Sequence, residues 1–441
     1  MNEAKRIHLI AIGGAAMHNL ALALHDNGNI VSGSDDQIYE PSLSRLNAKG
    51  LLPVEMGWFP EKISPAIDII ILGMHAKIDN PELLRALELD IPVMSYPEYV
   101  ALASKNKKRV VVAGSHGKTT TTSIIMHILR ENNMDFDYLV GSIIDGFDNM
   151  VRLSEAPLII IEGDEYLSSA LDLRPKIAHY QSDISIITGI AWDHINVFPT
   201  FDEYLKVFEN YINSHNEDAK IYYCEEDIHL NNFAQNHTNM LPYHGFDKDR
   251  NGNIMLNGEA YKFPMIGEHN LKNAQAAFLV CQELGVSQIE FFQALSTFTG
   301  AKKRLQLMND NGKVKIFLDF AHSPSKLKAT VDAVKSWFPD KELIAFFELH
   351  TYSSLQENFL VHYKSSLDKA DRAYVLYNED TLKIKNRKAP DAEKIILGFG
   401  NDTIKIINNK IAFEEEYEDA IKGENRVVLL MSSGDLFGVK I

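Results

Sequence analysis

A glycine-containing turn between a β-branched run and an amphipathic run constrains the fold of this chain most strongly. Residues 110–113 read Val-Val-Val-Ala, which is typical of a buried strand, and residues 119–130 place apolar side chains on one face of a helix. Two glycines and a Lys-Thr pair lie between the two runs. A strand that passes through such a turn into a helix is the unit of an α/β fold with a parallel sheet.

The turn has the composition of a phosphate-binding loop. Backbone N–H groups at a helix N-terminus can hold phosphate oxygens, Lys118 can neutralise them, and the Thr119 hydroxyl can reach Mg²⁺. The strict pattern G-x-x-x-x-G-K-[ST] would need glycine where Val112 stands, so a plain strand-to-helix turn is the alternative. The candidate ligands of a nucleoside triphosphate are Gly114, Ser115, His116, Gly117, Lys118, Thr119 and Thr120.

Acidic and histidine side chains follow two further apolar runs. Residues 158–161 indicate a buried strand that ends at Glu162, and residues 184–188 indicate a strand that leads to Asp193 and His194. Because the carboxyl ends of parallel strands meet at one edge of a sheet, we expect a carboxylate beside the phosphate loop, where Mg²⁺ needs one. A solvated acidic turn and a structural histidine are the alternatives.

Three α/β series follow one another along the 441 residues. At about 150 residues per domain, the length predicts about three domains. A polar run at 104–109 and a second boundary near 299–303 divide the chain into residues 1–105, 106–300 and 301–441. The run at 104–109 could equally be a solvated loop. A polar insert at 231–257 has no clear period and predicts loops and short strands.

Charge and cysteine content exclude several classes of partner and site. The 44 basic and 60 acidic residues give a net charge of −16, which argues against a nucleic acid or an anionic membrane as partner. The two cysteines are far apart in sequence, so a disulfide framework and a zinc knuckle are excluded. With no apolar run of about 18 residues and no signal peptide, we expect a soluble cytoplasmic protein.

Several motifs together resemble one family. They lie at 113–121, 162–165, 193–194, 267–273, Arg304 and 319–324. In this order they resemble the Mur ligases, the ATP-dependent amide ligases of peptidoglycan assembly, over essentially the whole chain. The resemblance implies a Rossmann-like UDP-sugar domain, a central P-loop ATPase domain, and a Rossmann-like C-terminal domain that selects the amine and closes on the nucleotide. It also implies ATP and Mg²⁺ as cofactors, and a monomer or weak homodimer.

Further stretches point to a branch of this family. Residues 12–17, 33–35, 39–41 and 178–180 look most like the murein peptide ligases. Members of that branch join L-alanyl-γ-D-glutamyl-meso-diaminopimelate to the lactyl carboxylate of UDP-N-acetylmuramate through an acyl phosphate, during wall recycling. The branch that adds L-alanine to the same UDP-sugar is the near neighbour. A non-catalytic nucleotide-binding relative is a third interpretation, from a different class.

The resemblance also implies residue roles. Lys118 would hold the β- and γ-phosphates, Thr119 and Glu162 would bind one Mg²⁺, and His194 would bind a second. The further roles fall to Asn270 at the adenine, to Arg304 and Asp319 closing on the nucleotide, and to Gly13, Gly14 and Asp35 near the UDP-sugar. Structural alternatives exist: Asn270 could cap a helix, Asp319 could simply end a strand, and Gly13-Gly14 is a weak dinucleotide signal.

Four positions depart from the family pattern or mark a branch of it. Gly189 stands where relatives commonly have Asn, and Gly141-Ser142 replaces a usual Gly pair. Residues 350–354, His-Thr-Tyr-Ser-Ser, occupy the stretch where relatives usually place an Arg near the amine substrate. Phe208 stands where some branches carry a carbamylated lysine, as in the branch that uses UDP-N-acetylmuramate.

Overall fold

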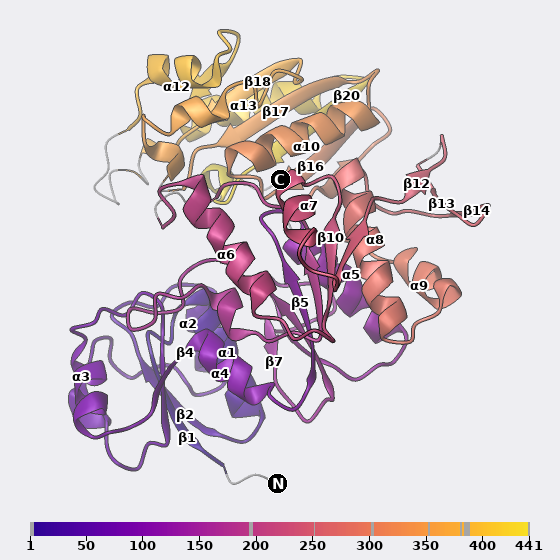
Figure 1. Ribbon diagram of the computed structural model, residues 1–441. Helices are drawn as coiled ribbons and strands as arrows, with labels where there is room; N and C mark the ends of the chain where they lie inside the picture. Colours follow the sequence, from indigo (N-terminus) through magenta and orange to yellow (C-terminus); the bar gives the residue numbers. More distant parts are fainter. Residues whose placement is uncertain are drawn as a thin grey trace. The chain divides into compact units, whose positions relative to one another are not determined.

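The chain folds into two compact units (Figure 1). A computed structural model describes residues 4–193, 197–250, 252–300, 304–351, 353–379, 382 and 389–439. The first unit contains residues 1–244 and 275–295, and the second contains residues 245–274 and 296–441. Two mainly parallel sheets lie in the first unit and one in the second, each with covering helices. The α/β fold class predicted from the sequence is confirmed, and three mainly parallel sheets follow one another along the chain, two of them within the first unit.

The first sheet is fully parallel, with the strand order β2-β1-β3-β4. Its strands are β1 (Arg6–Ile10), β2 (Ile30–Ser34), β3 (Ile69–Leu72) and β4 (Val93–Ser95), and its helices are α1 (Ala15–Asp26), α2 (Ser42–Ala48), η1 (Pro60–Lys62), α3 (Pro81–Glu88) and α4 (Tyr96–Ala103). Leu9 packs in one apolar cluster with Leu20 of α1, and Ile10 packs in another with Leu83 of α3. Helices therefore cover both faces of this sheet.

Local capping signals start two of these helices. The Asn80 side chain accepts hydrogen bonds from the first turn of α3, whose first residue is Pro81. Helix α4 begins with a capping box in which Ser95 and Glu98 each accept a hydrogen bond from the other's backbone N–H.

The central sheet has the order β11-β10-β9-β5-β8-β6-β7 and is parallel except for the edge strand β7. Its strands are β5 (Lys108–Ala113), β6 (Asp137–Leu139), β7 (Val151–Arg152), β8 (Leu158–Glu162), β9 (Ile184–Ile187), β10 (Lys220–Cys224) and β11 (Met240–Tyr243), and the helices of this part are α5 (Lys118–Glu131), η2 (Lys176–His179), α6 (Phe201–Asn213), α7 (Ile228–Ala234), α8 (Glu268–Glu283) and α9 (Gln288–Leu295). The three predicted strands are the neighbours β9, β5 and β8, so their carboxyl ends meet beside the phosphate loop.

The polar run between the first and central sheets is partly buried: Lys105, Asn106 and Lys108 are exposed, whereas Lys107 and Arg109 have partners in the protein. Lys107 Nζ donates to the carbonyls of Ser154 and Ala156 at 2.7 and 2.6 Å and pairs with Asp137 at 2.9 Å. The Arg109 guanidinium is 8% exposed and donates to the carbonyl oxygens of residues 101, 104 and 181. The solvated-loop alternative is therefore wrong for these two side chains, whose charges hold the two sheets' connecting segments in place.

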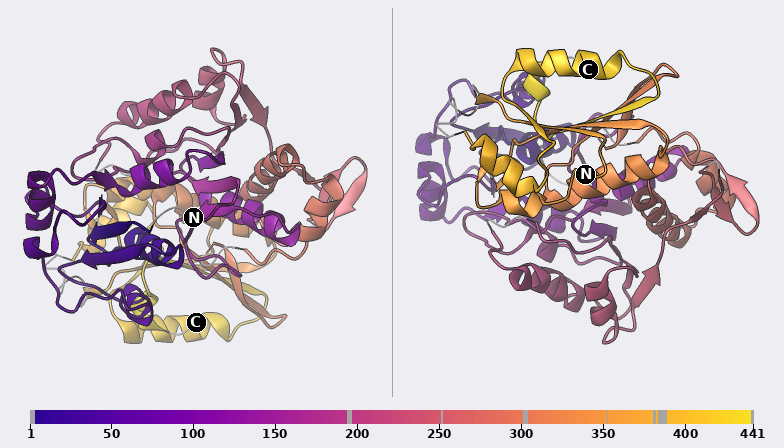
Figure 2. Two further views of the ribbon diagram at one scale, coloured as in Figure 1. Left: turned by 90° about the horizontal axis from the view of Figure 1, so that it is seen from below. Right: turned by 90° about the horizontal axis from the view of Figure 1, so that it is seen from above.

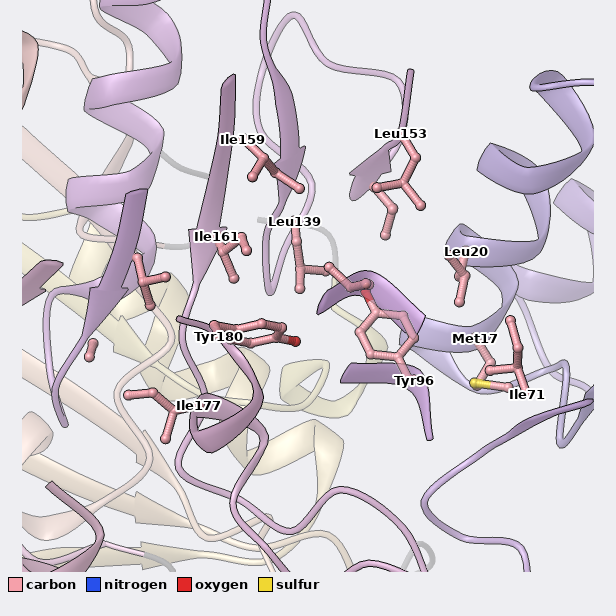
Figure 3. Packing of buried hydrophobic residues seen from close by; sticks show 14 of the residues in the cluster. Met17, Leu20, Ile71, Tyr96, Leu139, Leu153, Ile159, Ile161, Ile177 and Tyr180 are labelled. Carbon is pink, nitrogen blue, oxygen red and sulfur yellow. The ribbon is translucent and has the colours of Figure 1, made fainter. Parts of the chain in front are cut away.

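One apolar cluster spans the first and central sheets. Figure 3 shows Met17 and Tyr96, from the first sheet's layer, in the same cluster as Leu139, Ile161 and Tyr180, from the central part. Tyr96 and Tyr180 are 6% and 2% exposed. Burial of large apolar side chains on both sides makes the two sheets parts of one compact unit.

The second unit is built on a six-stranded sheet of order β15-β16-β20-β17-β18-β19, parallel except for the edge strand β15. Its strands are β15 (Gln306–Asp310), β16 (Val314–Asp319), β17 (Glu342–Glu348), β18 (Arg372–Leu376), β19 (Lys405–Ile407) and β20 (Arg426–Met431), and its helices are α10 (Pro324–Trp337), η3 (Ser353–Leu355), η4 (Leu360–Tyr363), α12 (Ala392–Phe399), α13 (Lys410–Ile421) and η5 (Leu436–Gly438). Phe347 packs in a cluster with Val331 of α10, and Phe346 contacts Phe413 of α13. The right-hand view of Figure 2 shows α10 and α13 on opposite faces of this sheet.

The polar insert contains the short strands that its sequence predicts. It includes β11 and, in the second unit, β12 (Asp247–Lys248) and β13 (Ile254–Leu256), which form a small antiparallel sheet with β14 (Glu259–Tyr261) just after the insert. Helix α7 at its start is an element that the sequence pattern did not predict. No helix within the described ranges combines the length and apolar character needed to cross a bilayer.

Candidate active site

The phosphate loop joins the end of β5 to the start of α5. Gly114 has φ +115° and Gly117 has φ +81°, a region that side-chain-bearing residues rarely adopt. A Cβ atom at Gly114 would also lie 2.8 Å from the backbone nitrogen of Thr188. Both the backbone conformation and the lack of space therefore require glycine at this position. Helix α5 then begins directly at Lys118, which aims its first-turn N–H groups at the loop.

Lys118 is held across the loop as a cation. Its Nζ donates to the Gly114 carbonyl at 2.6 Å and to Glu165 Oε2 at 2.8 Å. Burial alone would lower the pKa of Lys118, but the carboxylates of Glu165 and Asp164 raise it above its ordinary value. The lysine is therefore charged at neutral pH and available to phosphate oxygens.

Thr119 and Glu162 come together beside this lysine. The Thr119 hydroxyl donates to Glu162 Oε1 at 2.6 Å, and the backbone N–H of Gly141 donates to Glu162 Oε2 at 2.8 Å. A Cβ atom at Gly141 would lie 3.0 Å from Glu162 Oε1, so the first residue of the unusual Gly-Ser pair is the one that allows this approach. A hydroxyl and a carboxylate oxygen are ligands that Mg²⁺ prefers. The proposed third metal ligand, His194, lies outside the described residues.

A chain of hydrogen bonds links the phosphate loop to α6 and to the segment after β9. Tyr204 of α6 donates to Glu165 Oε1 at 2.9 Å and lies 2.8 Å from Ser115 Oγ, which accepts from the Ala191 N–H at 2.9 Å. Because Glu165 only accepts, Ser115 donates to Tyr204. Burial, with Glu165 beside it, raises the pKa of Tyr204, so the phenol keeps the proton that it donates. The sequence did not single out Glu165 or Tyr204: Glu165 stands in the acidic motif, and Tyr204 has no local signal.

Asp164 is paired away from the metal ligands. Its carboxylate lies 2.6 Å from Lys176 Nζ. Desolvation raises the pKa of Asp164, but the positive charges of Lys176 and Lys118 outweigh it and bring that pKa to about 2. Asp164 is therefore an anion throughout the neutral range, and it adds negative charge behind Lys118.

Gly189 has a backbone reason for being glycine. Its φ is +137°, and its carbonyl accepts from the Ser115 N–H at 2.9 Å. The next residue, Ile190, donates its N–H to Asp227 Oδ2 at 2.5 Å. The segment after β9 thus holds the phosphate loop through main-chain contacts, in a conformation that most side chains disfavour.

The first sheet carries a second glycine turn, between β1 and α1. Gly13 donates its N–H to Asp35 Oδ2 at 2.7 Å, and a Cβ atom there would lie 2.7 Å from Ile38 Cγ1. Asp35 is buried, which raises its pKa. The structure thus gives Asp35 a bond that shapes the turn. Gly14 precedes the first residue of α1, whose first-turn N–H groups have no acceptor within the helix.

A cavity of about 360 Å³ opens at the carboxyl edge of this first sheet. Leu72 and Ser95 line it where β3 and β4 end, and Ser169, Asp172 and Arg174 of the central part line it too. Ligands of open parallel sheets bind outside the carboxyl ends of the strands.

Three expected nucleotide residues belong to the second unit. Asp319 accepts from the N–H groups of Leu305 and Ala321, at 2.7 and 2.9 Å, and from the Thr330 hydroxyl at 3.1 Å. Asn270 lies in the first turn of α8, not at its cap, and donates to the Ile266 carbonyl at 2.7 Å. The Arg304 guanidinium lies 5.0 Å from the centre of the Phe320 ring.

The stretch that departs from the family pattern near the amine begins beside a buried acid. His350 Nδ1 lies 3.8 Å from Glu348 Oε1, and Glu348 is 1% exposed. Burial raises the pKa of Glu348, but hydrogen bonds from His350 and Ser432 lower it below its usual value. Phe208, at the position of a lysine in other branches, is fully buried against Tyr204, so it is a core residue here.

Comparison with known proteins places the chain in a family. Residues 6–108 match the model described as Mur ligase family, catalytic domain; residues 112–281 match Mur ligase middle domain; and residues 303–434 match Mur ligase, glutamate ligase domain. A UDP-N-acetylmuramate–L-alanine ligase from Clostridium kluyveri is 30% identical over 462 residues, which cover 99% of this chain and 97% of that protein.

Solved structures share the fold over nearly the whole chain. A murein peptide ligase from Psychrobacter arcticus has a TM-score of 0.67 at 22% identity, with 99% of this chain and 97% of that one covered. A UDP-N-acetylmuramate-alanine ligase from Thermotoga maritima has a TM-score of 0.71 at 21% identity, with 98% and 96% covered. The chain belongs to the Mur ligase family, whose members are ATP-dependent ligases that form amide bonds in the peptidoglycan pathway.

Proposed function

We propose that this chain uses ATP to join a peptide amine to the lactyl carboxylate of UDP-N-acetylmuramate. The amine that we propose is L-alanyl-γ-D-glutamyl-meso-diaminopimelate, released when the cell wall is recycled. In this scheme residues 1–105 hold the UDP-sugar, residues 106–300 hold ATP, and residues 301–441 select the amine and close on the nucleotide.

The convergence of Lys118, Thr119 and Glu162 at the carboxyl edge of the central sheet carries the proposal. Lys118 is charged, and the Thr119 and Glu162 oxygens lie 2.6 Å apart. These two oxygens fit Mg²⁺, whose usual ligands are hydroxyl, carboxylate and phosphate oxygens. Thr119 and Glu162 would hold one such ion, and His194 would hold a second.

The chain's own groups then serve a reaction between two anions. A carboxylate and an amine do not condense in water, so the carboxylate must first gain a better leaving group. The N–H groups of the loop and Lys118 would hold the β- and γ-phosphates in line with the carboxylate oxygen. Bound Mg²⁺ supplies additional positive charge there. The carboxylate oxygen attacks the γ-phosphorus and ADP leaves; the amine nitrogen then attacks the acyl carbon, phosphate leaves, and the amine loses a proton.

The first sheet supports the UDP-sugar assignment. The turn at Gly13-Gly14 presents the N-terminus of a 12-residue helix, and residues 11–17 include no charged side chain. A diphosphate can be held there by backbone N–H groups and by the helix dipole. The neighbouring cavity at Leu72 and Ser95 offers room for the sugar at the same edge.

A second candidate amine is free L-alanine. The name of the Clostridium kluyveri relative, at 30% identity, supports it. The motif at 178–180 supports the peptide. The two candidates share the UDP-sugar and ATP sites and differ only in the amine.

The test is ADP release by the full chain with ATP, Mg²⁺, UDP-N-acetylmuramate and a panel of amines that runs from L-alanine to the tripeptide. We expect release that depends on the UDP-sugar and is fastest with the tripeptide. Faster turnover with L-alanine would replace our first candidate with the second, and no amide product with any amine would contradict the proposed activity.

Variants assign the activity to the site. Lys118→Ala and His194→Ala should each abolish most of the ADP release. Lys220→Ala is the matched control, because Lys220 also pairs with a carboxylate, Glu283, at 2.7 Å but is exposed and far along the chain from the loop. Near-normal activity in either site variant would contradict the assignment.

A further inference from the structure

A buried histidine holds the glycine turn of the first sheet. His18 of α1 is 2% exposed, and its Nδ1 lies 2.9 Å from the Gly14 carbonyl oxygen and 3.0 Å from Ser42 Oγ. On the other side of the ring, Nε2 lies 3.2 Å from Arg45 Nη1. The imidazole thus bridges the turn that precedes α1 and a guanidinium on α2.

The partners of this ring fix its tautomer. A guanidinium only donates, so Nε2 must accept from Arg45, and the proton lies on Nδ1, where it faces the Gly14 carbonyl. Burial lowers the pKa of His18, and the charge of Arg45 lowers it further against the Gly14 bond. The neutral ring therefore connects Arg45 to Gly14 through one hydrogen bond on each side, so a shift of Arg45 would move the turn.

The Arg45 guanidinium reaches from the first sheet's layer to the central part. Its Nη1 donates to Asn19 Oδ1 at 2.8 Å, and its Nη2 donates to the Asp148 carbonyl at 2.8 Å and to Asn149 Oδ1 at 3.2 Å. Asn19 is fully buried and accepts the Met150 N–H at 3.1 Å. We call His18, Asn19, Arg45, Asn149 and Met150 the polar joint.

The far end of the polar joint leads to the metal carboxylate. The Met150 carbonyl accepts from the Val140 N–H at 2.9 Å. The next residue, Gly141, donates its N–H to Glu162 Oε2, and Thr119 donates to the other oxygen of the same carboxylate. A path of hydrogen bonds, joined by the main chain of Met150 and by the Val140–Gly141 peptide, therefore runs from Gly14 to the Thr119–Glu162 pair within the first unit.

We propose that Arg45 is a positioning residue that sets the register between the UDP-sugar turn and the metal carboxylate Glu162. This inference rests on the proposed function for the identity of the ligand at the turn. The substrate carboxylate must meet the γ-phosphate over a distance that spans both sheets. A misplacement of about 1 Å can cost about 100-fold in rate.

The apolar cluster in Figure 3 already holds the two sheets together, so adhesion does not need Arg45. Apolar contact is non-directional, whereas hydrogen bonds fix distance and angle. The planar guanidinium serves two Nη groups with partners on both sides, which a lysine ammonium on a flexible stem cannot reproduce. The chemistry of the polar joint is thus suited to register.

The test compares Arg45→Met and Arg45→Lys with Lys49→Met. Lys49 directly follows α2 and pairs with Asp26 at 2.6 Å, so it is a matched cation that bonds only within the first sheet's layer. Amide hydrogen exchange of Val140, Gly141 and Met150 is the first readout, because it requires no activity. Binding of UDP-N-acetylmuramate without ATP, and kcat for ADP release, are the second.

We expect these three amides to exchange about 10-fold faster in both Arg45 variants, and kcat to fall about 10-fold or more. Affinity for the UDP-sugar should change less than about 3-fold, and Lys49→Met should match the wild type in every readout. Exchange or kcat equal to that of Lys49→Met would overturn the proposal, as would a loss confined to UDP-sugar affinity.

Two safeguards keep the outcomes distinct. If Arg45→Met does not fold, Asn149→Ala removes a partner of Arg45 from the central side and must reproduce the exchange result at Val140 and Gly141 for the proposal to stand; Met150 does not count there, because Asn149 accepts its N–H directly. If the wild type neither binds UDP-N-acetylmuramate nor releases ADP with it, the proposed function fails. The exchange of Gly141 still decides whether Arg45 holds that segment.

Discussion

Two turns of this protein have the same place in the fold, between a parallel strand and the next helix, and differ in backbone and side chains. Gly13 and Gly14 lie between β1 and α1, where the positive φ belongs to Ala11, whereas the loop at 114–117 between β5 and α5 has positive φ at Gly114 and Gly117. The first turn is shaped by a buried carboxylate and a buried imidazole and has no charge of its own. The second adds Lys118 and Thr119 beside Glu162.

The difference shows where anion selectivity comes from. Helix N-termini supply N–H groups to both turns, and we propose that those of the first turn hold a diphosphate. A triphosphate with a metal ion needs a cation and hard oxygen ligands in addition, and only the second turn has them. Each turn can therefore be disabled without the other, and the following predictions use that independence.

The largest effect should come from removing the metal-facing hydroxyl of the second turn. Thr119→Val keeps the shape of the side chain but leaves Glu162 without its 2.6 Å partner. We expect kcat for ADP release to fall about 100-fold, with unchanged affinity for UDP-N-acetylmuramate, because only the metal pair is altered.

Thr122→Val is the control for this change. Thr122 lies on the same helix and is fully buried, and its hydroxyl has no partner within the part of the chain that the structure describes. Its removal should leave activity unchanged and stability equal or slightly higher. Equal losses in both variants would mean that the hydroxyl of Thr119 has no special role.

The two turns should also differ in their tolerance of a methyl group. Gly114→Ala forces a strained φ and a clash with backbone, whereas Gly13→Ala has no positive φ to strain and meets only the side chains of Ile38 and Asp35. We expect Gly114→Ala to lower the free energy of unfolding by about 3 kcal/mol and Gly13→Ala by about 1 kcal/mol, measured by urea denaturation.

Gly28→Ala isolates the strain. Gly28 has φ +82° with open space around it, so its replacement should cost only about 1 kcal/mol. A Gly114→Ala variant no less stable than Gly28→Ala would show that the contact with Thr188 relaxes at no cost.

The phosphate loop itself could be predicted from the sequence, whereas the distant residues that hold it in place could not. Local sequence is enough for the phosphate loop, because strand, turn and helix are adjacent, and parallel topology then brings Glu162 to the same edge. The role of Tyr204 could not be predicted, because it lies on α6, 86 residues after Lys118, and most buried tyrosines are core residues. Lys107 and Arg109 were ambiguous for a similar reason, because a basic run looks alike when it is solvated and when its partners lie far along the chain.

Backbone conformation and the actual hydrogen-bond partner of a motif residue also cannot be predicted from the sequence. Gly189 is a departure from the family pattern by letter, and only its φ of +137° explains it. Asp35 has a ligand role in the family resemblance, whereas in the structure it accepts a hydrogen bond from the Gly13 N–H. The residue type sets which interactions a side chain can make, and the fold determines which of them it makes.

A smaller effect should follow from the support beneath the second turn. Tyr204→Phe removes the hydroxyl that joins Ser115 to Glu165, while the contact of Lys118 with Glu165 remains. We expect the KM for ATP to rise about 5-fold, which corresponds to about 1 kcal/mol, while the KM for UDP-N-acetylmuramate stays unchanged.

Tyr211→Phe is the matched control for Tyr204. It is also a buried tyrosine of α6, but its hydroxyl bonds Ser182 and Ser185, away from the loop. If both variants raise the KM for ATP equally, the effect belongs to the helix and not to the hydrogen bond at Ser115.

The smallest effect should be a difference between the two turns in how acid changes the free energy of unfolding. Burial lowers the pKa of His18 below its ordinary value of 6.5, so an unfolded chain takes up the proton first as pH falls. The stabilisation is therefore present above pH 6.5 and is lost below it, by at most about 1.4 kcal/mol per pH unit for one proton. Lys118 behaves in the opposite sense: its raised pKa gives a stabilisation that is complete below pH 10.5, so it does not make stability depend on pH under acid conditions.

Urea denaturation at pH 7.0 and 5.5 should thus show a smaller acid-induced loss of unfolding free energy in His18→Gln than in the wild type, and an unchanged loss in Lys118→Met. Equal losses in all three proteins would place the acid sensitivity outside both turns, in other buried histidines such as His127 and His215, whose pKa values burial also lowers.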